Sequence, residues 1–133
     1  MEIRDAIEAD AERLASLTGA PTDVMRNLVH DRTVRVAEEN DTVTGFVSFD
    51  ARRETVHVTQ LEGDADLCTR LLKEPIRFAS TENMTVELLI AVDDTPSRKA
   101  AETAGFTEHG PGPRFDGTQT LRYRWEMSTV AEN

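Results

Sequence analysis

Three stretches of sequence between residues 33 and 61 alternate apolar and polar side chains, and only short turns separate them. Residues 33–39 read TVRVAEE, residues 43–51 read VTGFVSFDA and residues 55–61 read TVHVTQL. A period of two is typical of strands that bury one face. The short polar segments NDT and ARRE between them read as turns. This block therefore predicts an antiparallel meander of three strands.

Before this block, the sequence predicts one short strand and two helices. Residues 2–6 form the strand. Asp10 is the expected N-cap of a helix over residues 11–18, which Gly19 ends, and Thr22 or Asp23 is the expected cap of the next helix. The short connections between these segments leave no linker.

After the block, helical and strand patterns alternate. Residues 65–74 predict a helix, and Pro75 predicts a kink or a restart before residues 76–81, because proline removes a helical hydrogen bond. The apolar segment 84–92 predicts a central strand buried on both faces. Pro96 and Gly105 delimit a helix, and the Gly- and Pro-rich residues 109–119 predict a loop.

Residues 120–127 complete the pattern as a last strand, and residues 128–133 are expected to be a frayed tail. The order predicts a mixed α/β domain over residues 1–127. Its sheet has six to seven mostly antiparallel strands, with about four helices on both faces. One parallel step is expected where the third helix joins the fourth and fifth strands.

Composition limits the classes of partner. The formal net charge of the 133 residues is −10, and the 15 basic residues are almost all arginines. Acidic residues spread along a lysine-poor chain are typical of proteins from salt-loving organisms, although a surface for a basic partner is the alternative. No basic stripe suggests nucleic acid, and no apolar run suggests a membrane span. Without a secretory signal pattern, and with Cys68 as the single cysteine, a cytoplasmic protein is expected.

The order of elements, from IRDAIEADAERLASL through GFVSF and AGF to TLRYRWEM, resembles the GNAT superfamily of acyl-CoA-dependent N-acyltransferases. The resemblance covers nearly the whole chain, although no single motif is diagnostic. It implies the GNAT fold, acetyl-CoA as co-substrate, and direct attack of an amine on the thioester. The three histidines show no metal-ligand spacing with Cys68, so no metal is expected.

In that family a loop of the type Arg/Gln-x-x-Gly-x-Gly/Ala holds the CoA pyrophosphate before the third helix. Here the corresponding segment is LEGDADLCTRLL, in which Gly63 stands at the first position, and Asp66 and Cys68 replace the glycines. The implied CoA-binding residues are the Val58 backbone and the segment Gly63, Asp64, Ala65, Asp66, Leu67 and Cys68.

Two interpretations of this loop remain open. Amides at a helix start attract anions whatever the side chains are, so a phosphate site can survive these replacements. Alternatively, Asp64 or Asp66 caps the helix, occupies the amides and repels a phosphate. The sequence favours the capped helix start slightly.

The candidates for acid–base chemistry are few. A base must take a proton from the attacking ammonium, and the resemblance implies a group on the fourth strand, where His57 and Glu62 are the candidates. The family's Asn and general-acid Tyr in the last helix are replaced by Asp94 and Ala101. Tyr123, the only tyrosine, belongs to the last strand.

Two functions therefore follow from the sequence. One is an N-acetyltransferase that moves an acetyl group from acetyl-CoA to an amine. The other is a non-catalytic binding or regulatory module of the same fold. The sequence identifies neither the amine nor a protein partner nor the oligomeric state.

Overall fold

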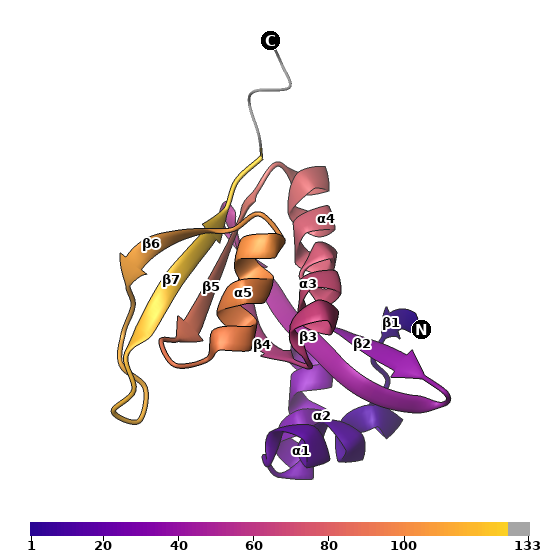
Figure 1. Cartoon of the computed structure of the whole chain (residues 1–133). Coiled ribbons are helices and arrows are strands. Elements are labelled where there is room, and N and C mark those ends of the chain that lie inside the picture. The colour runs from indigo at the N-terminus through magenta and orange to yellow at the C-terminus, as the bar shows by residue number, and fades with distance from the viewer. Residues whose placement is uncertain (128–133) are drawn as a thin grey trace.

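The computed structural model describes residues 1–127, which form an α/β fold built on a seven-stranded sheet (Figure 1). The expected frayed tail, residues 128–133, lies outside the described residues. The strand order is β1-β2-β3-β4-β5-β7-β6, and every neighbouring pair is antiparallel except β4 and β5. The predicted mixed α/β class, the meander and the single parallel step are confirmed.

The strands follow the alternating segments of the sequence closely. They are β1 (Glu2–Asp5), β2 (Thr33–Glu39), β3 (Thr42–Arg52), β4 (Thr55–Glu62), β5 (Thr85–Ala91), β6 (Thr107–Pro111) and β7 (Thr120–Trp125). Residues 109–119 were expected to form a loop, but the strand β6 extends to Pro111. The prediction of a loop was therefore wrong for residues 109–111. Pro111 is paired with Leu121 of β7, and the register is irregular between Glu108 and Pro111.

The helices lie where helical spacing was seen. They are the 3-10 turn η1 (Glu8–Asp10), α1 (Ala11–Thr18), α2 (Thr22–Asp31), α3 (Ala65–Leu71), α4 (Lys73–Glu82) and α5 (Thr95–Thr103). The predicted restart at Pro75 is confirmed, because α3 ends at Leu71 and Pro75 lies in the first turn of α4.

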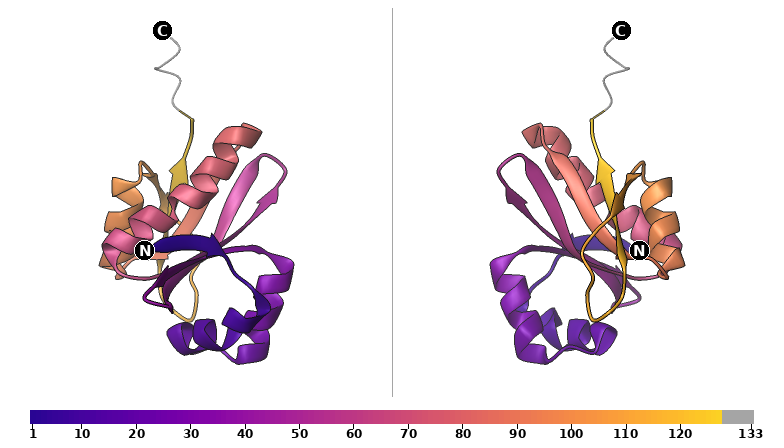
Figure 2. Two further views of the ribbon diagram at one scale, coloured as in Figure 1. Left: turned by 90° about the vertical axis from the view of Figure 1, so that its right-hand side faces the viewer. Right: turned by 90° about the vertical axis from the view of Figure 1, so that its left-hand side faces the viewer.

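Two hydrophobic cores form, one on each face of the sheet. On one face α1 and α2 cover residues such as Val36 and Phe46. On the other, α3, α4 and α5 cover a larger core that includes Val56, Leu71 and Tyr123. The views in Figure 2 show these helices as separate layers on opposite sides of the strands. Because α1 and α2 pack on β2 and β3, the face formed by β4, β5 and β7 keeps polar side chains.

The strand β5 shows this directly and corrects a prediction. Val86, Leu88 and Ile90 are buried, but Glu87 is only partly buried and Leu89 is 36% exposed. The strand is central in the sheet, yet it is not buried on both faces. The apolar run could not reveal this, because the missing cover is a property of where the helices pack.

The two predictions of helix caps have different outcomes. Asp10 is the N-cap residue of α1, as predicted, but its side chain makes no cap bond; its carboxylate accepts hydrogen bonds from the Ile7 amide and from Arg4. The N-cap of α2 is Pro21, which offers no side-chain cap. Helix starts packed against other elements can dispense with a cap of their own.

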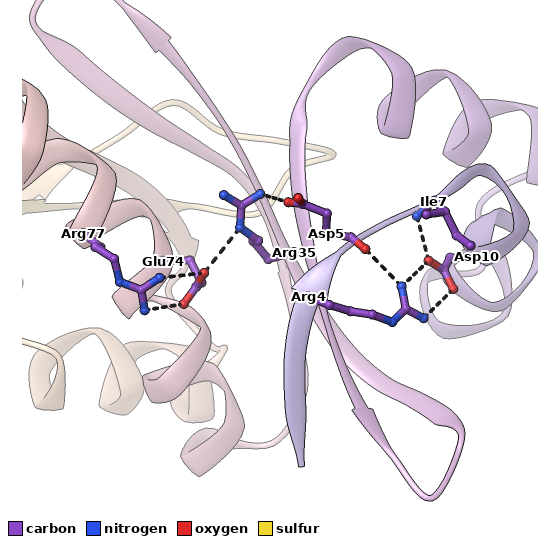
Figure 3. Close-up of polar contacts among 7 residues, drawn as sticks. All are labelled: Arg4, Asp5, Ile7, Asp10, Arg35, Glu74 and Arg77. Atoms are coloured by element: carbon purple, nitrogen blue, oxygen red, sulfur yellow. Dashed lines mark hydrogen bonds and ion pairs between the residues drawn. The ribbon is translucent and has the colours of Figure 1, made fainter.

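Ion pairs tie the layers to the sheet (Figure 3). Arg4 on β1 forms a two-pronged pair with Asp10, with distances of 2.9 and 3.1 Å. On the other face, the nearly buried Glu74 of α4 accepts from Arg77 at 2.8 Å and lies 3.3 Å from Arg35 of β2. Arg35 also pairs with Asp5. Buried carboxylates in this fold are therefore matched by arginines.

None of the helices in residues 1–127 has the length and apolar character needed to cross a membrane.

Candidate functional site

The parallel strands β4 and β5 separate halfway along their length. Their pairing runs from Thr55 and Thr85 to Val58 and Leu88. Beyond this point β4 continues to Glu62 and β5 to Ala91 with no pairing between them. The edge of β4 that faces β5 therefore offers free backbone groups, which need hydrogen-bond partners.

A bulge in β4 lies at the same place. Ser48 of β3 is paired with Gln60 and Phe49 with Val58, so Thr59 is the additional residue. The hydroxyls of Thr59 and Ser48 are 2.7 Å apart, and Ser48 is fully buried. A bulge bends its strand and increases the local twist. It thus explains why β4 and β5 part after Val58.

Two cavities meet at this separation. The strand-gap cavity, of about 150 Å³, lies between the parted strands and the start of α5. It is lined by Val58, Thr59, Gln60, Leu61, Leu88, Leu89, Ile90, Ala91, Asp94 and Ser97. The sheet-face groove, of about 710 Å³, lies on the face that α1 and α2 leave open. It is lined by Arg32, Asp50, Arg52, His57, Val58, Thr59, Glu87, Leu88, Leu89, Phe115 and Arg122. Val58, Thr59, Leu88 and Leu89 line both.

A row of charged side chains crosses the floor of the sheet-face groove. Asp50 of β3 is paired with His57 of β4, His57 with Glu87 of β5, and Glu87 with Arg124 of β7. Directly paired residues project from the same face of a sheet. His57 is therefore flanked by a carboxylate on each side, and it lies one residue before the shared wall of the two cavities.

The groove carboxylates are partnered by arginines. Asp50 pairs with Arg32, the residue that follows α2, and Glu87 lies 3.5 Å from Arg122 and 4.0 Å from Arg124. Arg52 also lines the groove, and it has no ion-pair partner among residues 1–127. The groove thus contains a free guanidinium, which favours an anionic group.

The start of α3 is a capped helix start. The Asp64 carboxylate accepts a hydrogen bond of 2.8 Å from the Leu67 amide. Gly63 has a φ of +142°, a conformation that side chains rarely adopt, and a Cβ there would meet Leu67 at 3.0 Å. Among residues 1–127, no acceptor takes the amides of Ala65 and Asp66. One amide of the first turn is occupied, and two remain as donors.

Carboxylates surround this helix start. Burial and the neighbouring Asp94 raise the pKa of Glu62 above its ordinary value of 4.5. Burial, together with Asp94, Glu62 and Asp64, raises the pKa of the Cys68 thiol to about 12. Cys68 is 1% exposed, so it is a core side chain and not a nucleophile. The local potential is negative at the position where the family resemblance implied a phosphate.

One cation offsets this potential. Arg70 lies one turn into α3 and lines a cavity of about 290 Å³ together with Asp64 and Asp66. No salt bridge engages Arg70 within the part of the chain that the structure describes. The donors at this end are therefore two amides and one guanidinium.

The structure separates the two candidates for the base. His57 lies on the groove floor, whereas Glu62 lies at the end of β4, where it contributes to the raised pKa of Cys68. Glu62 lines neither the strand-gap cavity nor the groove. Val58, whose backbone the family resemblance implied to bind CoA, lines both cavities. The predicted loop, residues 63–68, lies at the far end of the parted strand.

The start of α5 contributes a hydroxyl that sequence reasoning missed. Asp94 caps this helix by accepting from the Ser97 amide at 3.2 Å, and both residues line the strand-gap cavity. Ala101 is fully buried in the core. Tyr123 is also fully buried, and its hydroxyl accepts a hydrogen bond of 3.2 Å from Arg98. Tyr123 does not line the strand-gap cavity.

Sequence reasoning also missed Arg52, Glu87, Leu89 and Arg122. Each lies at an alternate position of a strand, so its face could be inferred once the pairing register was known. That register brings together residues from positions 32 to 122, and no local pattern indicates it. No cluster of three metal-ligating side chains occurs in residues 1–127.

Several solved structures resemble this fold over nearly its full length. A ribosomal-protein-alanine N-acetyltransferase from Brucella melitensis superimposes with a TM-score of 0.80 at 18% identity, covering 96% of this chain and 100% of its own. A protein from Salmonella typhimurium, solved with its cofactor acetyl-CoA, gives 0.79 at 22% identity, with 96% and 94% covered. A GNAT-family protein from Desulfovibrio desulfuricans gives 0.74 at 21% identity, with 94% and 98% covered. The chain therefore has the GNAT fold.

No protein-family model matches the sequence, and a search of curated proteins finds no match.

Proposed function

We propose that this protein is an N-acetyltransferase that transfers an acetyl group from acetyl-CoA to an amine by direct attack. The observation that carries the proposal is the meeting of two cavities at Val58, Thr59, Leu88 and Leu89. One cavity lies along a free strand edge, and the other opens on a polar groove. A thioester and an amine entering from opposite sides would meet at this wall.

Some residues of the site favour the binding of acetyl-CoA, and others oppose it. The free edge of β4 beyond Val58 offers the backbone donors and acceptors that pair with an amide-containing arm. The amides of Ala65 and Asp66 and the guanidinium of Arg70 suit phosphate oxygens. The Asp64 cap opposes them. When bound, acetyl-CoA supplies the activated acetyl thioester.

The acid–base roles follow from position. His57 lies on the groove side of the shared wall, where an amine would enter, so we assign the base to His57 and not to Glu62. It takes one proton from the ammonium, which frees the nitrogen lone pair for attack on the thioester carbonyl. As the N–C bond forms and the C–S bond breaks, a second proton leaves the nitrogen and protonates the departing thiolate. The Ser97 hydroxyl, on the opposite side of the wall, can donate a hydrogen bond to the departing sulfur.

The acidic composition supports a protein that works at high salt. The net charge of −10 is screened at molar salt, where the Debye length is about 3 Å. The same screening would weaken the repulsion between a phosphate and Glu62 or Asp64 wherever solvent reaches them. We therefore infer that the protein comes from a salt-rich setting and that its binding of acetyl-CoA depends on salt.

A thermal melt with and without millimolar acetyl-CoA, at low and at molar salt, tests whether acetyl-CoA binds as the acetyl donor. A ligand that binds the native state raises the melting temperature in proportion to RT ln(1 + [L]/Kd). We expect a shift that is larger at molar salt, followed by release of free thiol when suitable amines are added. No shift at either salt concentration would reject acetyl-CoA as the donor.

The second candidate is a non-catalytic binding module of the same fold. The capped start of α3 favours it, because Asp64 occupies one amide and further carboxylates lie nearby. The two functions differ in one result. The module predicts a cooperative melt that acetyl-CoA leaves unchanged, and no thiol release with any amine.

A further inference from the structure

The charged side chains that line the sheet-face groove indicate which class of amine it would bind as the acetyl acceptor. This inference rests on the proposed function, because it concerns the groove in which the amine would bind. The chain carries a net charge of −10, yet three arginines and only two carboxylates line this groove. The local balance is opposite to that of the molecule. An anion repelled by the rest of the surface would be attracted here.

Arg52 is the arginine that determines this balance. Arg32 is engaged by Asp50, and Arg122 lies 3.5 Å from Glu87. Arg52 lines the groove with no carboxylate partner in residues 1–127. A guanidinium presents two parallel donors that match a carboxylate. The partner that completes the groove is therefore an acid on the ligand.

The register gives the backbone separation between the row that carries Arg52 and the shared wall where the amine would react. Arg52 is paired with Thr55, which is paired with Thr85, and this row lies three residues before the last pair of Val58 and Leu88. At the rise of a strand, three residues correspond to about 10 Å. An amine at the shared wall and a carboxylate at Arg52 must therefore be separated by several bonds.

The other residues that line the groove also suit a ligand whose amine and carboxylate are several bonds apart. Leu89 and the 56% exposed Phe115 present apolar surface near the wall, while Asp50 and Glu87 flank His57. The apolar side chains suit a hydrocarbon spacer between the amine and the carboxylate of the ligand. The groove thus has paired charges beside His57, and the unpaired guanidinium of Arg52 lies further from the wall.

We propose that the acceptor is a primary amine that carries a carboxylate several bonds away, such as an ω-amino acid or a short peptide with a free terminus. Arg52 holds the carboxylate, and the amine lies beside His57. Arg52 is a specificity-determining residue in this assignment, and takes no part in the proton transfer.

A chain-length series tests the proposal. The probes are glycine, β-alanine, 4-aminobutanoate and 6-aminohexanoate, each with the alkylamine of equal carbon number. Two readouts are used: the melting-temperature shift without donor, and thiol release with acetyl-CoA. We expect the longest amino acid to be favoured over its alkylamine by roughly tenfold in both readouts, and glycine to show no such preference.

The variants assign the preference to one residue. In Arg52→Gln the ratio between 6-aminohexanoate and its alkylamine should fall towards one, and Arg52→Lys should restore part of it. Arg53→Gln is the matched control, since Arg53 is the next residue, carries the same charge and does not line the groove. It should keep the full ratio.

The two readouts separate the failure of this proposal from the failure of the proposed function. Turnover of both probes at equal rates, with no effect of Arg52→Gln, would overturn the carboxylate site and leave acetyl transfer standing. Binding of 6-aminohexanoate that depends on Arg52 but gives no thiol release would support the site and reject the transfer. A preference confined to glycine, or neither binding nor turnover of the whole series, would overturn the proposal.

Discussion

Strand β4 leads into the start of α3 and also lines the sheet-face groove, but charged side chains are arranged differently at these two places. In the groove, each carboxylate faces an arginine from a neighbouring element, and Arg52 is left over. At α3, Glu62, Asp64 and Asp94 lie close enough to raise the pKa of Cys68, and Arg70 is the nearby cation. The backbone geometry for binding an anion exists at α3, whereas the side chains for it exist in the groove.

This difference shows that a fold can keep a binding geometry while its side chains change the affinity. The helix start depends on the turn at Gly63, and the close approach of β3 depends on Gly45, where a Cβ would lie 2.4 Å from the Glu62 carbonyl oxygen. Both are backbone constraints. The carboxylates around them are additions that the backbone does not require.

The largest expected effect concerns the reactivity of the Cys68 thiol, which lies in α3 near Glu62, Asp64 and Asp94. Burial and three carboxylates raise its pKa to about 12, so the thiolate fraction at pH 8 should be roughly 1000-fold lower than that of an ordinary thiol. Alkylation by iodoacetamide should be slower by a similar factor and should become rapid in denaturant. The control is Arg53→Cys in a Cys68→Ser background, which should react at the ordinary rate. Equal rates for the two thiols would contradict the negative environment of α3.

The next effect concerns the base in the groove. His57→Gln should lower the rate of acetyl transfer by about 100-fold, because the ammonium loses its proton acceptor. The melting temperature should change little, since His57 lies on the open face of the sheet. His109→Gln on the exposed strand β6 is the matched control and should retain the parent rate. If His57→Gln retains it as well, the base lies elsewhere, and Glu62 becomes the next candidate.

The pH dependence of stability should differ between Asp10, which is paired with Arg4, and Glu62, which is partly buried near Asp94. Pairing with Arg4 lowers the pKa of Asp10 below its ordinary value of 3.8. The stability it contributes is therefore present above about pH 4 and is lost as the pH falls through the pKa of the folded state. Asp10→Asn should cost about 2 kcal/mol at pH 7, and this difference from the parent should shrink at pH 2.

Glu62→Gln is the contrasting variant in the same melting experiment. The pKa of Glu62 is raised, so its ionisation opposes folding, and the unfavourable contribution appears as the pH rises through the ordinary value of 4.5. The variant should be at least as stable as the parent at pH 7. Loss of stability in Glu62→Gln similar to that in Asp10→Asn would show that Glu62 has a stabilising partner.

The smallest effect separates charge from capping at α3. Asparagine caps as well as aspartate, so Asp64→Asn removes the charge and keeps the cap, whereas Asp64→Ala removes both at about 1 kcal/mol of stability. Asp64→Asn should bind acetyl-CoA up to about tenfold more tightly at low salt, and the gain should shrink at molar salt. Calorimetric titration measures this, with Asp116→Asn in the β6–β7 loop as a remote control. Tighter binding in the remote control would indicate a general effect of net charge.

Much of the fold could be predicted because its signals are local. The alternation over residues 33–61 predicted three strands, Pro75 predicted the restart between α3 and α4, and Gly19 predicted the end of α1. The start of α3 was also accessible, since Asp64 is one of the two caps considered. Each of these depends on residues within one turn or one strand of each other.

The failures share a different cause. Asp10 is the N-cap residue of α1 as expected, but its side chain makes no cap bond and pairs with Arg4 of β1. The strand β5 was expected to be buried on both faces, but within residues 1–127 Glu87 is only partly buried and Leu89 is exposed on its outer face. His57 and Glu62 were both predicted as bases, and only the register shows that His57 alone lines the groove.

The sequence by itself determined the order of strands and helices, the turn at Gly63 and the acidic character of the chain, because these follow from local conformational preference and composition. Only the tertiary structure decided that Arg32, Arg52, His57, Glu87 and Arg122 share one groove. The physical reason is that strand register and the separation of β4 from β5 are set by packing between distant segments, and a side chain acquires its neighbours only when those segments pair.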